Sequence, residues 1–273
     1  MSREGKPADV AGYFPFHEFF ALDLRSLALF RVCLAVMVLL DWVDRLPDLA
    51  IHYSDDGLAP RAIITGLVPV SVHMLSGSVW WQAFLAAVAL GFGLMLLVGW
   101  RTPLAAFMSF FLLISVHARN PSLLQGGDQL LRAVLLWGVF LPLGACWSVD
   151  SCGEGRQAKE KSVLSFASFV LVGQLFIIYL FAAAWKWLPE WRDQGTAVLL
   201  AMQVDAFSTR LGKLMRESHA LCYWLTQSSV WLETLGTALL LLPFHVGLQR
   251  LVAIFLFVTF HAGLALSLEL RLF

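Results

Sequence analysis

Charged residues are scarce in this chain of 273 residues: 14% are Asp, Glu, Lys or Arg, whereas 59% are hydrophobic. A water-soluble domain carries about a quarter charged residues, so this chain has too little polar surface to cover a globule in water. Its mean hydropathy of +0.75 points the same way. The composition predicts an integral membrane protein. The zero net charge and the dispersed basic residues exclude a nucleic-acid-binding protein.

Several motifs that carry chemistry in other proteins are missing. There is no glycine-rich phosphate loop and no G-x-S-x-G nucleophile elbow. The seven histidines occur singly, with no partner four residues away, so no metal site is predicted. Of the four cysteines, Cys146 and Cys152 could form a disulfide, although free thiols are favoured. The first 26 residues contain no apolar run before a cleavage site, so we expect no cleavable signal peptide.

The chain is instead rich in long apolar runs. A membrane span needs about 20 mostly apolar residues, and seven segments approach this: 27–44, 79–99, 103–117, 130–146, 163–187, 221–244 and 247–268. Residues 195–207 have the pattern of an amphipathic helix lying on the membrane. We therefore expect an all-α integral membrane bundle of about seven transmembrane helices plus an interfacial amphipathic helix. The distribution of Lys and Arg favours a cytoplasmic amino-terminal segment, 1–25.

A few polar side chains interrupt these runs, and each needs a partner or a function there. Arg31 either reaches the headgroups or ties two helices together. Asp41 with Arg45, and Asp128 with Arg132, have the spacing of local salt bridges. A buried membrane histidine such as His261 either satisfies a hydrogen-bonding group on a neighbouring helix or belongs to a site.

Lys186 ends an apolar run and is flanked by Trp185 and Trp187. Its immediate helical neighbours offer no partner, and Tyr179 shares its helix face. Two interpretations remain open: the ammonium reaches the headgroups, or it is a dry, neutral amine. Burial can lower a lysine pKa by up to 3–5 units, and a neutral amine could take a proton from a phenol or hydroquinone. Bulk solvent around its nitrogen, or a carboxylate that locks the amine as a cation, would remove the enzymatic hypothesis.

Four segments, in order along the chain, resemble one family. They are Ser26–Arg31 with Leu40-Asp41, the Trp147-Ser148-Val149-Asp150 element, Gly173–Tyr179 followed by Lys186 five residues before Trp191, and His261. Together they resemble the membrane domain of vitamin K-dependent gamma-glutamyl carboxylase and its bacterial relatives, the horizontally transferred transmembrane domain family. The resemblance covers residues 26–273. It leads us to expect a carboxylase-like domain in a bacterial inner or plasma membrane. The sequence stops at Phe273 directly after an apolar run, which leads us to expect either a trimmed domain or a missing last helix.

The resemblance implies an activity: epoxidation of a reduced naphthoquinone by oxygen, coupled to γ-carboxylation of glutamate by carbon dioxide. It assigns catalysis to Lys186, as the base, and His261, as the group that stabilises negative charge on the quinone oxygen. The expected cofactor is reduced vitamin K or another quinol, with no metal. The residues expected to bind it are Tyr179, Gln174, Asn120, His117 and Arg31. Expected partners are membrane lipid, a lipid quinone and a peptide or protein substrate.

The chain departs from the carboxylase in one motif. Arg119-Asn120-Pro121-Ser122 has proline where the carboxylase has a histidine, and His117 is displaced from that position. The large region with which the carboxylase recognises protein substrates is also absent. Two alternatives therefore stay open: a non-catalytic membrane component that binds or matures a partner, and a quinone-binding redox protein without carboxylation.

Overall fold

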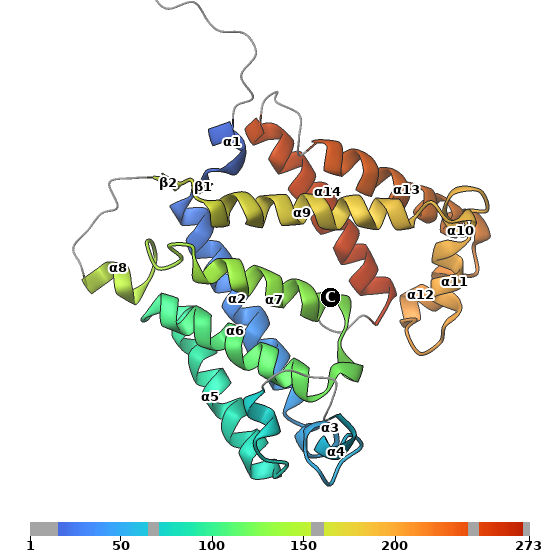
Figure 1. The fold of residues 1–273 in the computed structure, drawn as a ribbon. Helices are drawn as coiled ribbons and strands as arrows, with labels where there is room; N and C mark the ends of the chain where they lie inside the picture. The colour runs from blue at the N-terminus through green and yellow to red at the C-terminus, as the bar shows by residue number, and fades with distance from the viewer. Residues whose placement is uncertain (1–15, 65–70, 154–160, 240–245, 270–273) are drawn as a thin grey trace, which may run out of the picture. The chain divides into compact units, whose positions relative to one another are not determined.

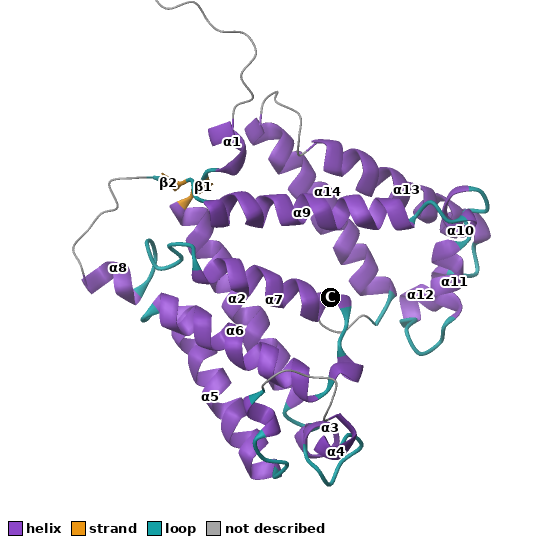
Figure 2. Ribbon diagram, viewed as in Figure 1, coloured by secondary structure: helices purple, strands orange, loops and turns teal. Residues whose placement is uncertain are grey.

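The structure, a computed structural model, describes residues 16–64, 71–153, 161–239 and 246–269. Nearly all the regular structure in these ranges is α-helix (Figure 2), which confirms the expected all-α class. The chain forms two compact units. The first comprises Met1–Ala21 and Leu175–Leu268, and the second comprises Leu22–Gln174 and Glu269–Phe273. The boundary falls within helix α9 (Phe166–Trp185), so this helix contributes residues to both units.

Within the described ranges, five helices are long and apolar enough to cross a membrane. They are α2 (Leu24–Arg45), α5 (Val79–Val98), α6 (Thr102–Arg119), α9 and α14 (Val246–Ser267). Two other expected spans differ. Helix α7 (Gly126–Val139) has 14 residues, about 21 Å, which is less than the hydrocarbon core of about 30 Å. Helix α13 (His219–Leu239) is long enough at 21 residues but falls outside this set because of its polar side chains.

In the second unit, α2 packs on α5, α5 on α6, and α6 on α7 (Figure 1). Alanines at the contacts are almost fully buried, among them Ala35, Ala86 and Ala105, and such small side chains allow membrane helices to approach closely. Two short strands, β1 (Leu22–Asp23) and β2 (Ser162–Val163), pair antiparallel beside the start of α2. The other elements are short: α3 (Leu49–Tyr53), α4 (Arg61–Ile64), η1 (Val72–Met74), η2 (Pro121–Leu123) and α8 (Val149–Gly153).

The first unit contains α1 (Phe16–Phe20), the later part of α9, and α13 packed on α14. Three short helices connect α9 to α13: α10 (Pro189–Arg192), α11 (Ala197–Gln203) and α12 (Arg210–Met215). The amphipathic helix expected over 195–207 is therefore shorter. It packs against α13, with Met202 and Cys222 in one apolar cluster. All four cysteines are free, as favoured from the sequence.

Candidate functional site

Helix α13 turns a largely polar face toward the protein. Its buried positions fall three or four residues apart, the spacing of one helix face, and four of them are polar: Thr226, Ser229, Glu233 and Thr237. Large apolar residues such as Trp224 and Trp231 are exposed instead, at 68% and 59%. This reversal of the water-soluble pattern suits a helix whose outer face meets lipid and whose inner face forms a polar site.

Glu233 forms an ion pair with Lys186, which follows α9 directly. Both side chains are largely buried, with 12% of Lys186 and 7% of Glu233 exposed. The ammonium therefore does not reach toward solvent. Its carboxylate partner is one of the two findings that count against the dry, neutral amine considered from the sequence. The neighbours of Lys186 on its own helix offer no partner, as expected, but α13 supplies one from 47 residues further along the chain.

An aromatic ring also lies against the amine of Lys186. Trp191, on the short helix α10, places its ring 4.8 Å from Nζ of Lys186, a cation–π arrangement. Helix α10 is held on α13 by Gln227, whose side-chain nitrogen donates to the backbone oxygens of Trp191 and Arg192 at 3.2 and 3.3 Å. The spacing of five residues between Lys186 and Trp191 thus brings the indole back over the amine.

Two further predicted residues of the first unit meet each other. The hydroxyl of Tyr179 lies 3.1 Å from Nε2 of His261, so α9 and α14 are joined by a hydrogen bond. The Tyr179 ring also packs on Phe257, with ring centroids 4.1 Å apart. Phe257 fits closely against α13 because Gly236 has no side chain there. Glu233 is near enough to interact electrostatically with both Tyr179 and His261.

The remaining predicted residues belong to the second unit. Gln174 is half-buried on α9, next to the boundary between the units. Arg31 is 1% exposed and donates to the backbone oxygen of Trp147 at 2.6 Å. Arg31 is thus bound within the protein, but to a loop before α8 and not to a second helix as considered from the sequence.

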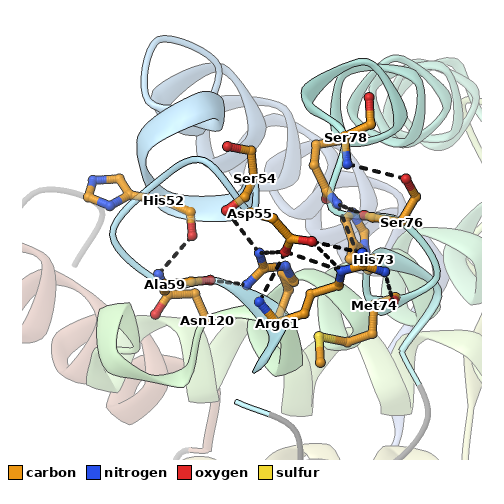
Figure 3. Close-up of polar contacts among 12 residues, drawn as sticks. His52, Ser54, Asp55, Ala59, Arg61, His73, Met74, Ser76, Ser78 and Asn120 are labelled. Carbon is orange, nitrogen blue, oxygen red and sulfur yellow. Dashed lines mark hydrogen bonds and ion pairs between the residues drawn. The ribbon is translucent and has the colours of Figure 1, made fainter. Parts of the chain in front are cut away.

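Asn120, labelled in Figure 3, and its neighbour Arg119 hold the end of α3 and the loop that follows it. The Asn120 amide donates to the backbone oxygen of His52 at 2.9 Å. Arg119 donates to the backbone oxygens of Ala59 and Ser54, while Asp55 in the same loop pairs with Arg61. These contacts give the Arg119-Asn120 motif a structural role in this unit.

His117 belongs to a buried cluster centred on Arg45. The Arg45 guanidinium contacts Asp41 at 2.7 Å, Asp128 at 2.8 Å, Nε2 of His117 at 3.1 Å and the Tyr53 hydroxyl at 2.6 Å. The Asp41–Arg45 pair expected from the sequence is confirmed. The other expected pair is wrong: Asp128 pairs with Arg45 rather than with Arg132, because α7 brings its first turn against the end of α2.

A cavity of about 380 Å³ lies beside this cluster and is lined by residues of α2, α3, η2 and the start of α7. Ligand atoms of Asp41, His117 and Asp128 lie within 4.8 Å of one another, a grouping of the kind that can hold a metal ion. The Arg45 guanidinium, however, contacts all three. The arginine therefore supplies the positive charge that a metal ion would otherwise bring to these ligands.

A family model described as the HTTM domain matches residues 19–273. The chain belongs to the HTTM domain family. No curated protein and no solved structure matches it. The match agrees with the expected family and with an integral membrane protein, and it covers both compact units of this HTTM domain.

Sequence reasoning missed two residues that organise these sites. Glu233 stands in an expected span, and an acidic residue there was itself a signal, because a buried carboxylate needs a partner. Tyr53 was missed because a tyrosine after a short loop carries no distinguishing pattern. Its hydroxyl completes the Arg45 cluster only through the fold.

Proposed function

We propose that this HTTM domain is a membrane enzyme that takes a proton from a reduced naphthoquinone, in quinol epoxidation by oxygen coupled to γ-carboxylation of glutamate by carbon dioxide. The observation that carries the proposal is the Tyr179–His261 hydrogen bond between α9 and α14, in the same unit as the largely buried side chain of Lys186. Ionisable side chains are costly to bury within a membrane protein, and a cluster of them is typical of a site.

The surroundings fit a lipid quinol. Helices α9 and α14 are only 17% buried over their most apolar windows, so their outer faces are available to bilayer-dissolved molecules. Tyr179 and His261 offer hydrogen bonds to a ring oxygen, and Phe257 and Phe260 offer flat apolar contacts beside them. When bound, the quinol would supply the reducing equivalents that activate oxygen.

Each side chain then has a separate task. The Tyr179 hydroxyl and the His261 ring would orient the quinol oxygen and stabilise negative charge on it. Lys186 would receive the proton at Nζ, while Trp191 shields the amine from water on one side. Because Lys186 is paired with a carboxylate in this structure, the amine must first give up the proton that it already holds.

Turnover of reduced vitamin K tests this proposal. The protein in lipid nanodiscs is supplied with the quinol and oxygen, and the epoxide is quantified by chromatography. Lys186→Ala should lower the rate at least about a hundredfold, the usual contribution of a general base, whereas Lys213→Ala should not. Incorporation of labelled carbon dioxide into a glutamate-containing peptide tests the carboxylation. Unchanged epoxide formation in Lys186→Ala would remove the lysine from the mechanism.

A second candidate function follows from the same ion pair. In a non-catalytic membrane component that binds or matures a partner, Lys186 and Glu233 would serve only to join α9 to α13. Replacing both by methionine would then preserve folding and partner binding, since apolar pairs can substitute for buried ion pairs. Binding of the quinol without carbon dioxide incorporation would instead identify a redox protein.

A further inference from the structure

The carboxylate of Glu233 is placed where a proton leaving Lys186 can be received. The carboxylate oxygen Oε2 is in direct hydrogen-bond contact with Nζ, and the side chain is 7% exposed. Both partners therefore sit in surroundings that are largely shielded from water. Such surroundings disfavour separate charges and so reduce the advantage of an ion pair over a neutral amine beside a neutral carboxylic acid.

Hydroxyl groups continue from Glu233 along the buried face of α13. Ser229 lies four residues before Glu233 and Thr226 seven before it, both buried. Residues three or four apart on a helix are about 5–6 Å apart, a gap that one water molecule can bridge. Thr226 also accepts a hydrogen bond from the backbone N–H of Val198 at 3.1 Å, so this polar face extends to the start of α11.

We propose that Glu233 is the proton-relay partner of Lys186, acting through the lysine rather than on the substrate. The proton on Nζ moves to Oε2, which converts the ammonium–carboxylate pair into an amine and a carboxylic acid. The amine then takes the quinol proton, and Glu233 releases its own proton along the hydroxyl face toward water. One proton leaves the quinol and one reaches solvent, so no redox partner is needed. This inference rests on the proposed function.

Infrared difference spectroscopy of the wild-type protein tests the relay directly. Reduced menadione is added under nitrogen, so that no turnover occurs. In time-resolved spectra the relay predicts a transient carbonyl band of a protonated carboxylic acid, which appears on addition of the quinol and decays as Glu233 releases its proton. The band must be absent from Glu233→Gln and retained in Glu217→Gln. Glu217 is an exposed glutamate of the same unit and is the matched control. A spectrum without this band in the wild type overturns the relay, whatever the enzyme activity.

The pH dependence of quinol oxidation supplies the second test. In Glu233→Gln the lysine must lose its proton to solvent unaided, so the rate should fall at least tenfold near pH 7 and recover toward the wild-type rate at high pH. Glu233→Asp should restore the neutral rate to within about threefold of wild type. A uniform loss at every pH indicates a purely structural pair and contradicts the relay.

The two proposals can fail separately. A carbonyl band without oxidation of the quinol in air keeps the relay and rejects the enzymatic proposal. Oxidation that depends on Lys186 but is accompanied by no carbonyl band keeps the enzyme and rejects Glu233 as the relay.

Discussion

The carboxylate of Asp150 caps helix α6 from 48 residues away, through Thr102. One carboxylate oxygen accepts both the backbone N–H of Thr102 at 2.8 Å and its hydroxyl at 2.7 Å. The other accepts the backbone N–H of Arg101 at 2.8 Å. Burial raises the pKa of Asp150, but the hydrogen bonds from Thr102 and Arg101 outweigh it and hold the pKa below its usual value. The Trp147–Asp150 element thus has a structural role, because it caps the start of α6.

Removing this cap should destabilise the second unit. Asp150→Ala leaves the first amides of α6 without their acceptor, and the loss of a cap costs about 1–2 kcal/mol. Thermal unfolding in detergent, followed by circular dichroism, measures the change. Asp48→Ala is the matched control, because Asp48 precedes α3 without any side-chain capping bond. Equal effects of the two substitutions would contradict a specific role for Asp150.

Gly99 should tolerate no side chain. Its φ of +71° lies in the left-handed region, which costs other residues about 1–2 kcal/mol. A Cβ there would also lie 2.0 Å from Nη1 of Arg31 and would push the guanidinium away from Trp147. Gly99→Ala should therefore lower the free energy of unfolding by at least about 2 kcal/mol.

Gly91 provides the comparison for Gly99. It lies within α5, and a Cβ added to it would meet no atom of another residue within 4 Å. Gly91→Ala should leave stability unchanged or raise it by up to about 1 kcal/mol, the difference in helix propensity. If both alanines are tolerated in the same unfolding assay, the close contact between Gly99 and Arg31 is not formed.

The helices could be predicted from the sequence because their signal is local. Apolar runs located α2, α5, α9 and α14 to within a few residues, since each run is nearly continuous. The span near 130–146 was placed less well, because the Pro142-Leu-Gly144 stretch keeps the run apolar after α7 has ended at Val139. Composition does not distinguish an apolar turn from an apolar helix.

The candidate site could be predicted only in part, because its pairs are made between distant segments. The position of Lys186 as an unusual cation followed from its own neighbours. Its partner Glu233 did not, since nothing local relates α9 to α13. Likewise, spacing paired Asp128 with Arg132, whereas the packing of α2 against α7 gives it Arg45.

Arg45 should be among the most sensitive residues of the second unit. Arg45→Met would leave Asp41 and Asp128 facing each other without a counter-charge, and removal of one partner from a buried ion pair costs about 3–5 kcal/mol. Arg132→Met is the control, as Arg132 has no ion pair in the described part of the chain. A loss of stability in Arg132→Met as large as in Arg45→Met would favour the local pair over the observed one.

His73 should make stability depend on pH in the mildly acidic range. Burial, with a smaller contribution from the charge of Arg119, lowers the pKa of His73 to about 3. Its ring is 1% exposed, and Nδ1 lies 2.7 Å from the Ser115 hydroxyl. In the unfolded chain the His73 ring takes up a proton near pH 6.5, whereas in the folded protein the ring stays neutral down to about pH 3. Stability contributed by the neutral ring is therefore complete above pH 6.5 and is lost as the pH falls toward 3.

The expected slope is up to about 1.4 kcal/mol per pH unit for one proton. His73→Gln removes the titrating group while keeping a hydrogen-bonding side chain, so it should reduce the slope between pH 6.5 and 4.5. His219→Gln, at an exposed histidine, should leave the slope as in the wild type. Denaturant unfolding in detergent across this range measures both variants. An unchanged slope in His73→Gln would show that another group takes up the proton, because a histidine that stays neutral only by burial must contribute to the slope.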